Sequence, residues 1–147
     1  MILIADSGST KTHWCLIDGT DLIQEVMTEG INPYYQNTDD IKSIIEHQLL
    51  PSLAGYSPKS IHFYGAGCAF EEKKAIITQA IGFYFQDILI TVESDLVAAC
   101  RGLFQEQQGI ACILGTGSNS CLYDGSTIVK NVSPLGFILG DEVSGAV

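Results

Sequence analysis

The first thirty residues alternate between short hydrophobic runs and tight polar turns. Residues 2–5 are apolar at every position, as in a central strand that is covered on both faces. Residues 12–17 and 22–27 form two further runs, and Asp18-Gly19 between them is a hairpin signal. This pattern predicts three antiparallel strands at the start of the chain.

The next apolar positions have helical spacing. After a polar loop, five positions are spaced to form one face of a helix: Ile41, Ile44, Ile45, Gln48 and Leu49. Asn37 or Thr38 is the expected N-cap, because short polar side chains accept hydrogen bonds from the first free amides. The helix is expected to end near Pro51 or Gly55.

Strands and helices alternate in the following segment. The pattern predicts a strand over 59–64, a helix over 71–85, a strand over 88–92 and a helix over 94–104 with Ser94 as its cap. Residues 106–109 are a polar connector, so we place a domain boundary between 107 and 108. Three strands followed by alternating helices and strands describe an α/β domain over residues 1–107.

The chain then repeats its opening pattern. Three further runs at 110–114, 120–123 and 127–132 predict three more strands, and residues 121–126 echo residues 15–20. We interpret 108–147 as the incomplete start of a second, duplicated domain. A second sheet needs as much chain as the first to cover it, so we expect a fragment or half of a split protein. Its open sheet edge and apolar face favour a homodimer.

Composition excludes several classes of partner. The chain has 147 residues, 46% of them hydrophobic, which is enough for a sizeable core. Seventeen acidic residues against 7 basic ones give a net charge of -10, and no basic stripe is present for nucleic acid or a membrane surface. No apolar run approaches the ~20 residues of a membrane span. We expect a soluble, cytoplasmic protein.

Cysteine and histidine spacing predicts no metal or disulfide framework. The five cysteines lack the Cys-x-x-Cys spacing, and those in strand-like or helix-like surroundings are interpreted as buried free thiols: Cys15, Cys100, Cys112 and Cys121, with Cys68 in a loop. His13, His47 and His62 share no spacing that would assemble a metal site. Both observations fit a reducing cytoplasm.

Two similar polar turns predict a phosphate site. Gly8 lets the backbone approach a ligand, consecutive amides can form a concave anion site, and Lys11 adds a positive charge. A serine-rich turn without function is the alternative for either turn alone, but two copies favour binding one polyphosphate between them. The predicted phosphate-binding residues are Ser7, Gly8, Ser9, Thr10, Lys11, Gly115, Thr116, Gly117 and Ser118. Asp6 is suited to orient the water shell of Mg²⁺.

Neither turn is a Walker loop, because each joins two strands and the Gly-x-x-x-x-Gly-Lys pattern is absent. Four ordered motifs, at 6–12, 93–99, 115–119 and 140–146, make the sequence resemble the N-acetylglucosamine kinases and the related BadF/BadG-type ATPases of the actin, hexokinase and Hsp70 superfamily. The resemblance implies a ribonuclease H-like, actin-like ATPase fold. It also implies ATP and Mg²⁺ as cofactors and a small sugar as substrate.

The resemblance also implies roles for individual residues. Asp95 matches the catalytic aspartate, a general base for the attacking sugar hydroxyl, although helix capping is the alternative use of this carboxylate. The sugar-binding positions are Asn32, Asp95, Asn119 and Asp141, and Asp141 also matches a metal position that acts through water. The chain departs from the family pattern at Val143, where glycine is common, and in the first turn, where many members carry Gly-Gly-Gly-Thr.

The sequence therefore predicts an ATP-dependent kinase that transfers the γ-phosphate directly to an amino sugar, first of all N-acetylglucosamine. Two alternatives stay open: an ATPase that activates a partner enzyme, and a non-catalytic sugar-sensing relative. In the family the adenosine pocket comes from sequence beyond Val147, so we expect the isolated chain to be inactive.

Overall fold

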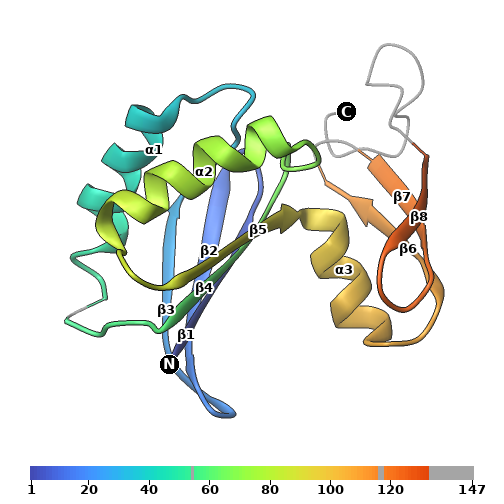
Figure 1. The fold of residues 1–147 in the computed structure, drawn as a ribbon, viewed down its shortest axis with the longest axis horizontal. Helices are drawn as coiled ribbons and strands as arrows, with labels where there is room; N and C mark the ends of the chain where they lie inside the picture. Colours follow the sequence, from blue (N-terminus) through green and yellow to red (C-terminus); the bar gives the residue numbers. More distant parts are fainter. Residues whose placement is uncertain (54, 116–117, 133–147) are drawn as a thin grey trace. The chain divides into compact units, whose positions relative to one another are not determined.

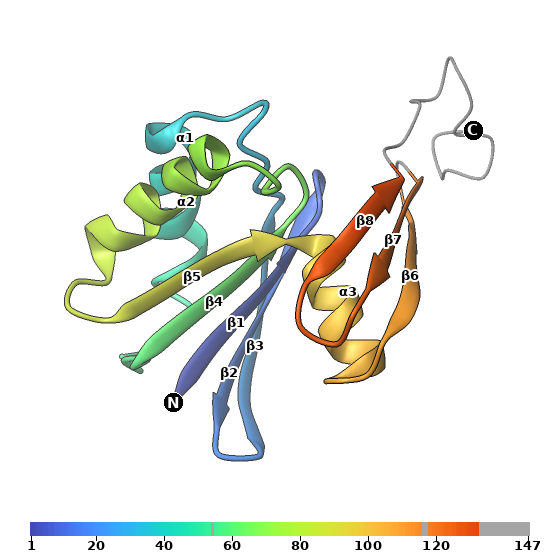
Figure 2. The same cartoon turned by 45° about the vertical axis from the view of Figure 1, so that its right-hand side comes forward.

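The structure is a computed structural model that describes residues 1–53, 55–115 and 118–132. The chain forms two compact units, Met1–Asp95 and Leu96–Val147, here called the N-terminal and C-terminal units. The N-terminal unit contains a five-stranded sheet of order β3-β2-β1-β4-β5 (Figures 1 and 2). Its strands are β1 (Ile2–Ser7), β2 (Lys11–Asp18), β3 (Asp21–Glu29), β4 (Ser60–Gly65) and β5 (Leu89–Ser94).

The sheet joins antiparallel and parallel parts. β1, β2 and β3 pair antiparallel as two consecutive hairpins, while β4 and β5 extend the sheet in parallel on the other side of β1. Each parallel connection carries a helix, as parallel pairing requires. The predicted mixed α/β sheet is confirmed.

Helices α1 (Thr38–Ile44) and α2 (Glu71–Tyr84) lie on the same face of this sheet (Figure 1). α1 continues into one π-helical turn, η1 (Ile45–Leu49). The core between helices and sheet takes every second strand residue, including Leu3, Ala5, Trp14, Leu16, Ile61, Phe63 and Val92. The expectation that residues 2–5 are covered on both faces is wrong for Ile2, which is 42% exposed, because α1 and α2 share one face.

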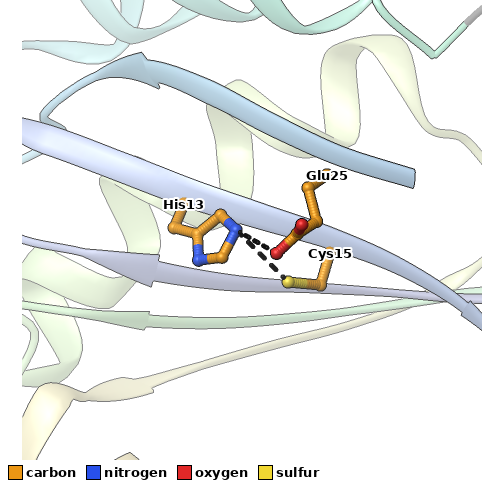
Figure 3. A group of neighbouring side chains, drawn as sticks. All are labelled: His13, Cys15 and Glu25. Atoms are coloured by element: carbon orange, nitrogen blue, oxygen red, sulfur yellow. Dashed lines mark hydrogen bonds and ion pairs between the residues drawn. The ribbon is translucent and has the colours of Figure 1, made fainter. Parts of the chain in front are cut away.

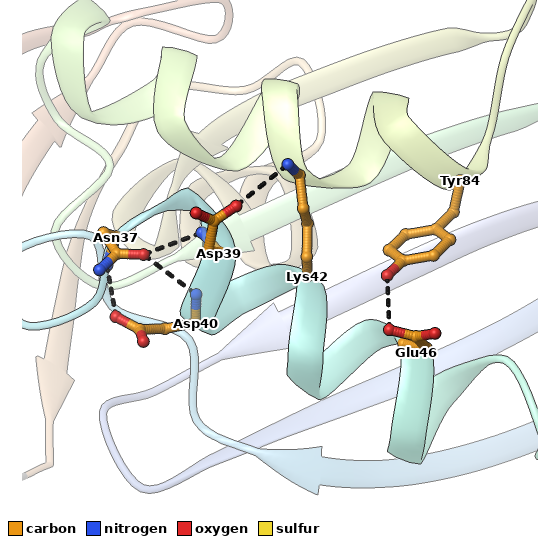
Figure 4. Close-up of polar contacts among 6 residues, drawn as sticks. All are labelled: Asn37, Asp39, Asp40, Lys42, Glu46 and Tyr84. Carbon is orange, nitrogen blue, oxygen red and sulfur yellow. Dashed lines mark hydrogen bonds and ion pairs between the residues drawn. The ribbon is translucent and has the colours of Figure 1, made fainter.

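The start of α1 follows the predicted capping chemistry (Figure 4). Asn37 Oδ1 accepts hydrogen bonds from the amides of Asp39 and Asp40 at 2.8 and 3.1 Å, and the Asn37 amide donates to Asp40 Oδ2 at 2.9 Å. This reciprocal capping box satisfies amides that a helix leaves free at its start. Further along, the Tyr84 hydroxyl of α2 donates to Glu46 at 3.1 Å and links the two helices.

The C-terminal unit combines a helix with an antiparallel three-stranded sheet, β6-β7-β8. Its elements are α3 (Asp95–Phe104), β6 (Gly109–Leu114), β7 (Ser118–Tyr123) and β8 (Ile128–Val132). Its small core consists of Leu96, Cys100, Ala111, Cys121 and Tyr123. The units divide before Leu96 because α3 packs against this sheet; the boundary of the duplicated copies at 107/108 stays a prediction.

The two hairpins with similar sequences both contain an irregular ladder, while their duplication stays a prediction. The ladder between β2 and β3 is irregular at Leu16/Ile17, and the ladder between β7 and β8 is irregular at the equivalent Leu122/Tyr123. The prediction that Cys112 is buried is wrong, because its side of β6 is exposed. No described helix is long and apolar enough to cross a membrane.

Candidate active site

The predicted residues of the N-terminal unit gather at one edge of its sheet. The parallel ladders align Ser7 of β1 with Gly65 of β4, and Gly65 with Ser94 of β5. The first turn therefore leaves the same edge as Asp95, which follows Ser94. Carboxyl ends of parallel strands are where ligands bind in α/β sheets.

The first turn is anchored from inside by the Ser7 hydroxyl. Ser7 Oγ lies 2.7 Å from Thr12 Oγ1 and 3.0 Å from both the carbonyl oxygen and the amide nitrogen of Ile31. The Gly8 amide donates to the Lys11 carbonyl at 3.0 Å. Since the Ser7 side chain is buried, its hydroxyl serves the fold, and contact with a phosphate would have to come from the backbone. Asp6 and Lys11 are exposed beside this turn.

The loop that carries Asn32 is packed against the first turn. Asn32 Nδ2 donates to Ser9 Oγ at 3.0 Å, and its Oδ1 accepts from the Tyr34 amide at 3.0 Å. A Cβ added to Gly30 would lie 2.5 Å from the Gly8 carbonyl oxygen, so only glycine permits this approach. Two predicted site elements, the turn and Asn32, thus form one network.

A second loop, which sequence reasoning missed, completes this edge. It follows β4, and its Ala66 amide donates to the Ser7 carbonyl at 2.8 Å. Gly67 has a φ of +82°, and a Cβ there would lie 2.6 Å from Asn32 Oδ1. The signal was present, because glycines at 65 and 67 directly after a predicted strand indicate a tight turn or a close backbone approach.

Asp95 lies in an acidic neighbourhood of the same loop. Burial, and after it the negative charge of Asp95, raise the pKa of the Cys68 thiol to about 12. Glu93 of β5 is paired with Lys74 of α2, at 2.8 Å between Oε2 and Nζ. Burial alone lowers the pKa of Lys74, but its hydrogen bonds to Glu93 and Glu71 outweigh that effect and raise it. Glu93 is thus held by an ion pair to α2.

The second predicted turn is described in part. Gly115 is exposed after β6, and Ser118 begins β7, while Thr116, Gly117 and Asp141 lie outside the described residues. Asn119 Oδ1 is buried and has no hydrogen-bond partner among the residues that the structure describes. A buried acceptor without a partner is uncommon and fits a ligand-contacting position. The convergence of the two turns on one ligand stays a prediction.

Comparisons with known proteins bear on this site. No protein-family model and no curated protein matches the sequence. A crystal structure described as a "Putative N-acetylglucosamine Kinase" from Porphyromonas gingivalis matches with a TM-score of 0.94 at 45% identity, over 99% of this chain and 52% of that one. The resemblance to N-acetylglucosamine kinases is confirmed. The chain spans about half the length of the P. gingivalis protein.

More distant structures show the fold alone. A protein from Chromobacterium violaceum with the same description matches with a TM-score of 0.69 at 18% identity, over 99% of this chain and 52% of that one. A ROK hexokinase from Thermus thermophilus matches with a TM-score of 0.60 at 17% identity, over 92% of this chain and 50% of that one. The chain has the actin-like ATPase fold.

Proposed function

We propose that this chain is the phosphate- and sugar-binding part of an ATP-dependent kinase that phosphorylates an amino sugar, N-acetylglucosamine in the first place. The supporting observation is the single edge of the N-terminal sheet that carries the first turn, Asn32 and Asp95. Similarity to the P. gingivalis protein over 99% of this chain supports the substrate class.

In this proposal Asp95 is the general base. It accepts the proton of the sugar hydroxyl as that oxygen attacks the γ-phosphate, and such bases contribute about 10²–10⁴ in rate. Asn32 positions the sugar through its carboxamide, since amides both donate and accept directional hydrogen bonds. Asn119 and Asp141 would add sugar contacts, and residues 7–11 and 115–118 would hold the phosphates.

The residues beside the first turn fit a magnesium ion. Asp6 offers an exposed carboxylate at the end of β1, next to the proposed phosphate site, and carboxylate oxygen suits Mg²⁺. When bound, Mg²⁺ neutralises charge on the phosphates. Asp6 would orient it directly or through its waters, and Asp141 through water.

The decisive experiment is turnover by the natural full-length protein carrying this sequence, with Mg²⁺, ATP and N-acetylglucosamine and with glucose as a competing sugar. Asp95→Asn should lower kcat by about 10²–10⁴ and change sugar affinity far less, because the carboxamide can still hydrogen-bond the sugar but cannot accept the proton of its hydroxyl. Asp18→Asn is the matched control, since Asp18 lies at the other end of β2 beside the N-terminus, 3.2 Å from the Met1 amine.

Each outcome is informative. Phosphorylated sugar made by the wild type and lost with Asp95→Asn supports the proposal. Sugar binding without turnover in the wild type would indicate a sensing relative, and ATP hydrolysis without sugar phosphorylation would indicate an activating ATPase. Cytoplasmic location, a homodimer and the inactivity of the isolated chain remain predictions. Light scattering tests whether the protein is a homodimer.

A further inference from the structure

We propose that His13, Cys15 and Glu25, here called the edge cluster, form a binding site for one zinc ion, separate from the kinase proposal. The three side chains lie on two neighbouring strands at the edge of the N-terminal sheet (Figure 3). One donor atom from each lies within 4.8 Å of the other two. This is the one such group of three found among the residues that the structure describes.

The edge cluster faces away from the packed core. Residues 12, 14 and 16 of β2 are buried under α1 and α2, so His13 and Cys15, which alternate with them, point to the opposite face. His13 is 41% and Glu25 54% exposed, and Cys15 is half-buried. An ion can therefore reach the donors from solvent.

A β-bulge brings Glu25 into the edge cluster. Near the turn, Asp18 pairs with Asp21 and Ile17 with Leu22, and a regular ladder would then place Gln24 opposite Cys15. The irregularity between Leu16 and Ile17 shifts the register by one residue, so that Cys15 pairs with Glu25 instead. A one-residue shift exchanges the faces of a strand, and bulges often re-aim side chains at functional sites.

Both partners converge on a single nitrogen of His13. Nε2 lies 3.0 Å from Glu25 Oε1 and 3.7 Å from Cys15 Sγ. A ring nitrogen holds one proton or one lone pair, so it cannot donate to the carboxylate and accept from the thiol at once. A cation at the centre of the three atoms would satisfy all of them together.

The spacing and the donor types favour zinc. Bonds of ~2.0–2.3 Å in a tetrahedral site put neighbouring ligand atoms about 3.3–3.8 Å apart. The 3.7 Å contact of Nε2 with Cys15 Sγ lies within this range, and the 3.0 Å contact with Glu25 Oε1 lies just below it. A set of one imidazole, one thiolate and one carboxylate suits Zn²⁺, with water as the fourth ligand. Mg²⁺ requires octahedral coordination by oxygen atoms, and only one of these three ligands offers oxygen, so Mg²⁺ should not compete with zinc for this site.

Equilibrium dialysis of the purified protein against Zn²⁺, followed by metal analysis, tests the proposal. We expect one equivalent per chain, retained in excess Mg²⁺. Cys15→Ser, His13→Gln and Glu25→Gln should each weaken binding at least tenfold, because even outer-shell partners of metal ligands contribute about 10–100-fold. Cobalt as a probe should give a thiolate-to-metal charge-transfer band that Cys15→Ser removes.

Two control variants separate the edge cluster from adventitious binding. Cys112→Ser removes an exposed thiol of the C-terminal unit, and His47→Gln removes an exposed imidazole on η1. Both should bind zinc as the wild type does. Near-ultraviolet circular dichroism of Trp14, the one tryptophan, reports whether each variant keeps its core. If Cys15→Ser does not fold, zinc binding by Glu25→Gln tests the edge cluster in its place.

The proposal is overturned if the protein retains no zinc, if Mg²⁺ displaces it, or if a folded edge-cluster variant binds as tightly as the wild type. It is likewise overturned if Cys112→Ser alone abolishes binding. None of these results depends on sugar phosphorylation, so the two proposals can fail independently.

Discussion

The hairpins β2–β3 and β7–β8 share a sequence pattern and a bulge but bury opposite faces. Leu16 is 1% exposed, whereas Leu122, which holds the same place in the sequence pattern, is 43% exposed. The neighbouring cysteines behave in the reverse way, since Cys15 is half-buried and Cys121 is 3% exposed. Equivalent residues thus have different structural roles in the two units.

The difference follows from the helices that cover each sheet. α1, η1 and α2 pack on the Leu16 side of the N-terminal sheet, while α3 packs on the Cys121 side of the C-terminal one. Ile110, Leu114 and Leu122 therefore remain exposed on the other face, at 68%, 69% and 43%. Hairpins with a shared sequence pattern can keep the same local geometry, whereas burial depends on what packs against each of them.

The largest expected effect comes from the leucine pair. Leu16→Ala should destabilise the N-terminal unit by about 2–5 kcal/mol, because it leaves a cavity in a packed core. Leu122→Ala should change stability by no more than about 0.5 kcal/mol, as exposed positions do. Urea unfolding followed by Trp14 fluorescence measures the effect of Leu16→Ala. Hydrogen exchange of the amides in β6–β8 measures the effect of Leu122→Ala. Equal losses would contradict the difference in burial.

The two turn glycines should also respond differently. Gly19 and its counterpart Gly125 both have positive φ, +62° and +104°, so alanine at either position is strained by about 1–2 kcal/mol. A Cβ at Gly125 would also lie 2.3 Å from the Glu106 carbonyl oxygen, whereas nothing lies within 4 Å at Gly19. Gly125→Ala should therefore cost about 1–3 kcal/mol more than Gly19→Ala.

Urea unfolding of both glycine variants checks this difference. Gly82→Ala is the positive control, because it lies within α2 with its nearest contact at 3.7 Å and should stabilise by about 0.5–1 kcal/mol. A Gly125→Ala variant as stable as Gly19→Ala would show that the Glu106 backbone yields easily.

The buried Cys68 thiol should make stability depend on pH in the alkaline range. The folded pKa of Cys68, about 12, lies above the ordinary value of 9.0, so the folded protein holds this proton more tightly than the unfolded chain. The stability contribution is therefore full below about pH 9 and is lost as the pH rises toward 12. Cys68→Ala should flatten that decline in urea midpoints.

The smallest expected effect concerns Asp124, in the turn between β7 and β8. Hydrogen bonds from the Thr127 and Ser126 amides lower the pKa of the exposed Asp124 to about 2, below the ordinary 3.8. Its contribution is present above pH 3.8 and is lost as the pH falls toward 2. Nuclear magnetic resonance titration of the Asp124 carboxyl measures this pKa. Ser126→Ala together with Thr127→Val removes the two hydroxyl donors but keeps the two amide donors, so it should raise this pKa only part of the way toward 3.8.

Sequence periodicity predicted most elements of the fold, because hairpins and amphipathic helices are local patterns. The Asn37 cap and the hairpin turns are examples. Element ends were harder to predict: the strand predicted over 88–92 runs to Ser94, because Ser94 pairs with Gly65 of β4. That pairing joins segments almost thirty residues apart, which no local pattern encodes.

The candidate site was predictable in part. The first turn, Asn32 and Asp95 were chosen from the sequence, and the structure gathers them at one sheet edge. The Gly67 approach to Asn32 and the Lys74–Glu93 ion pair were missed, because each contact joins residues from different elements. The inference that histidine spacing excludes a metal site considered histidines alone, and it did not consider Cys15 and Glu25 across the hairpin.

The sequence by itself determined the hairpins and pointed to the candidate site residues, because turn residues and a period of two act over a few positions. Only the tertiary structure decided which face of each hairpin is buried and that Glu25 joins His13 and Cys15. A bulge of one residue and the placement of a helix decide those outcomes, since each changes which side chains share a face without changing the alternation itself.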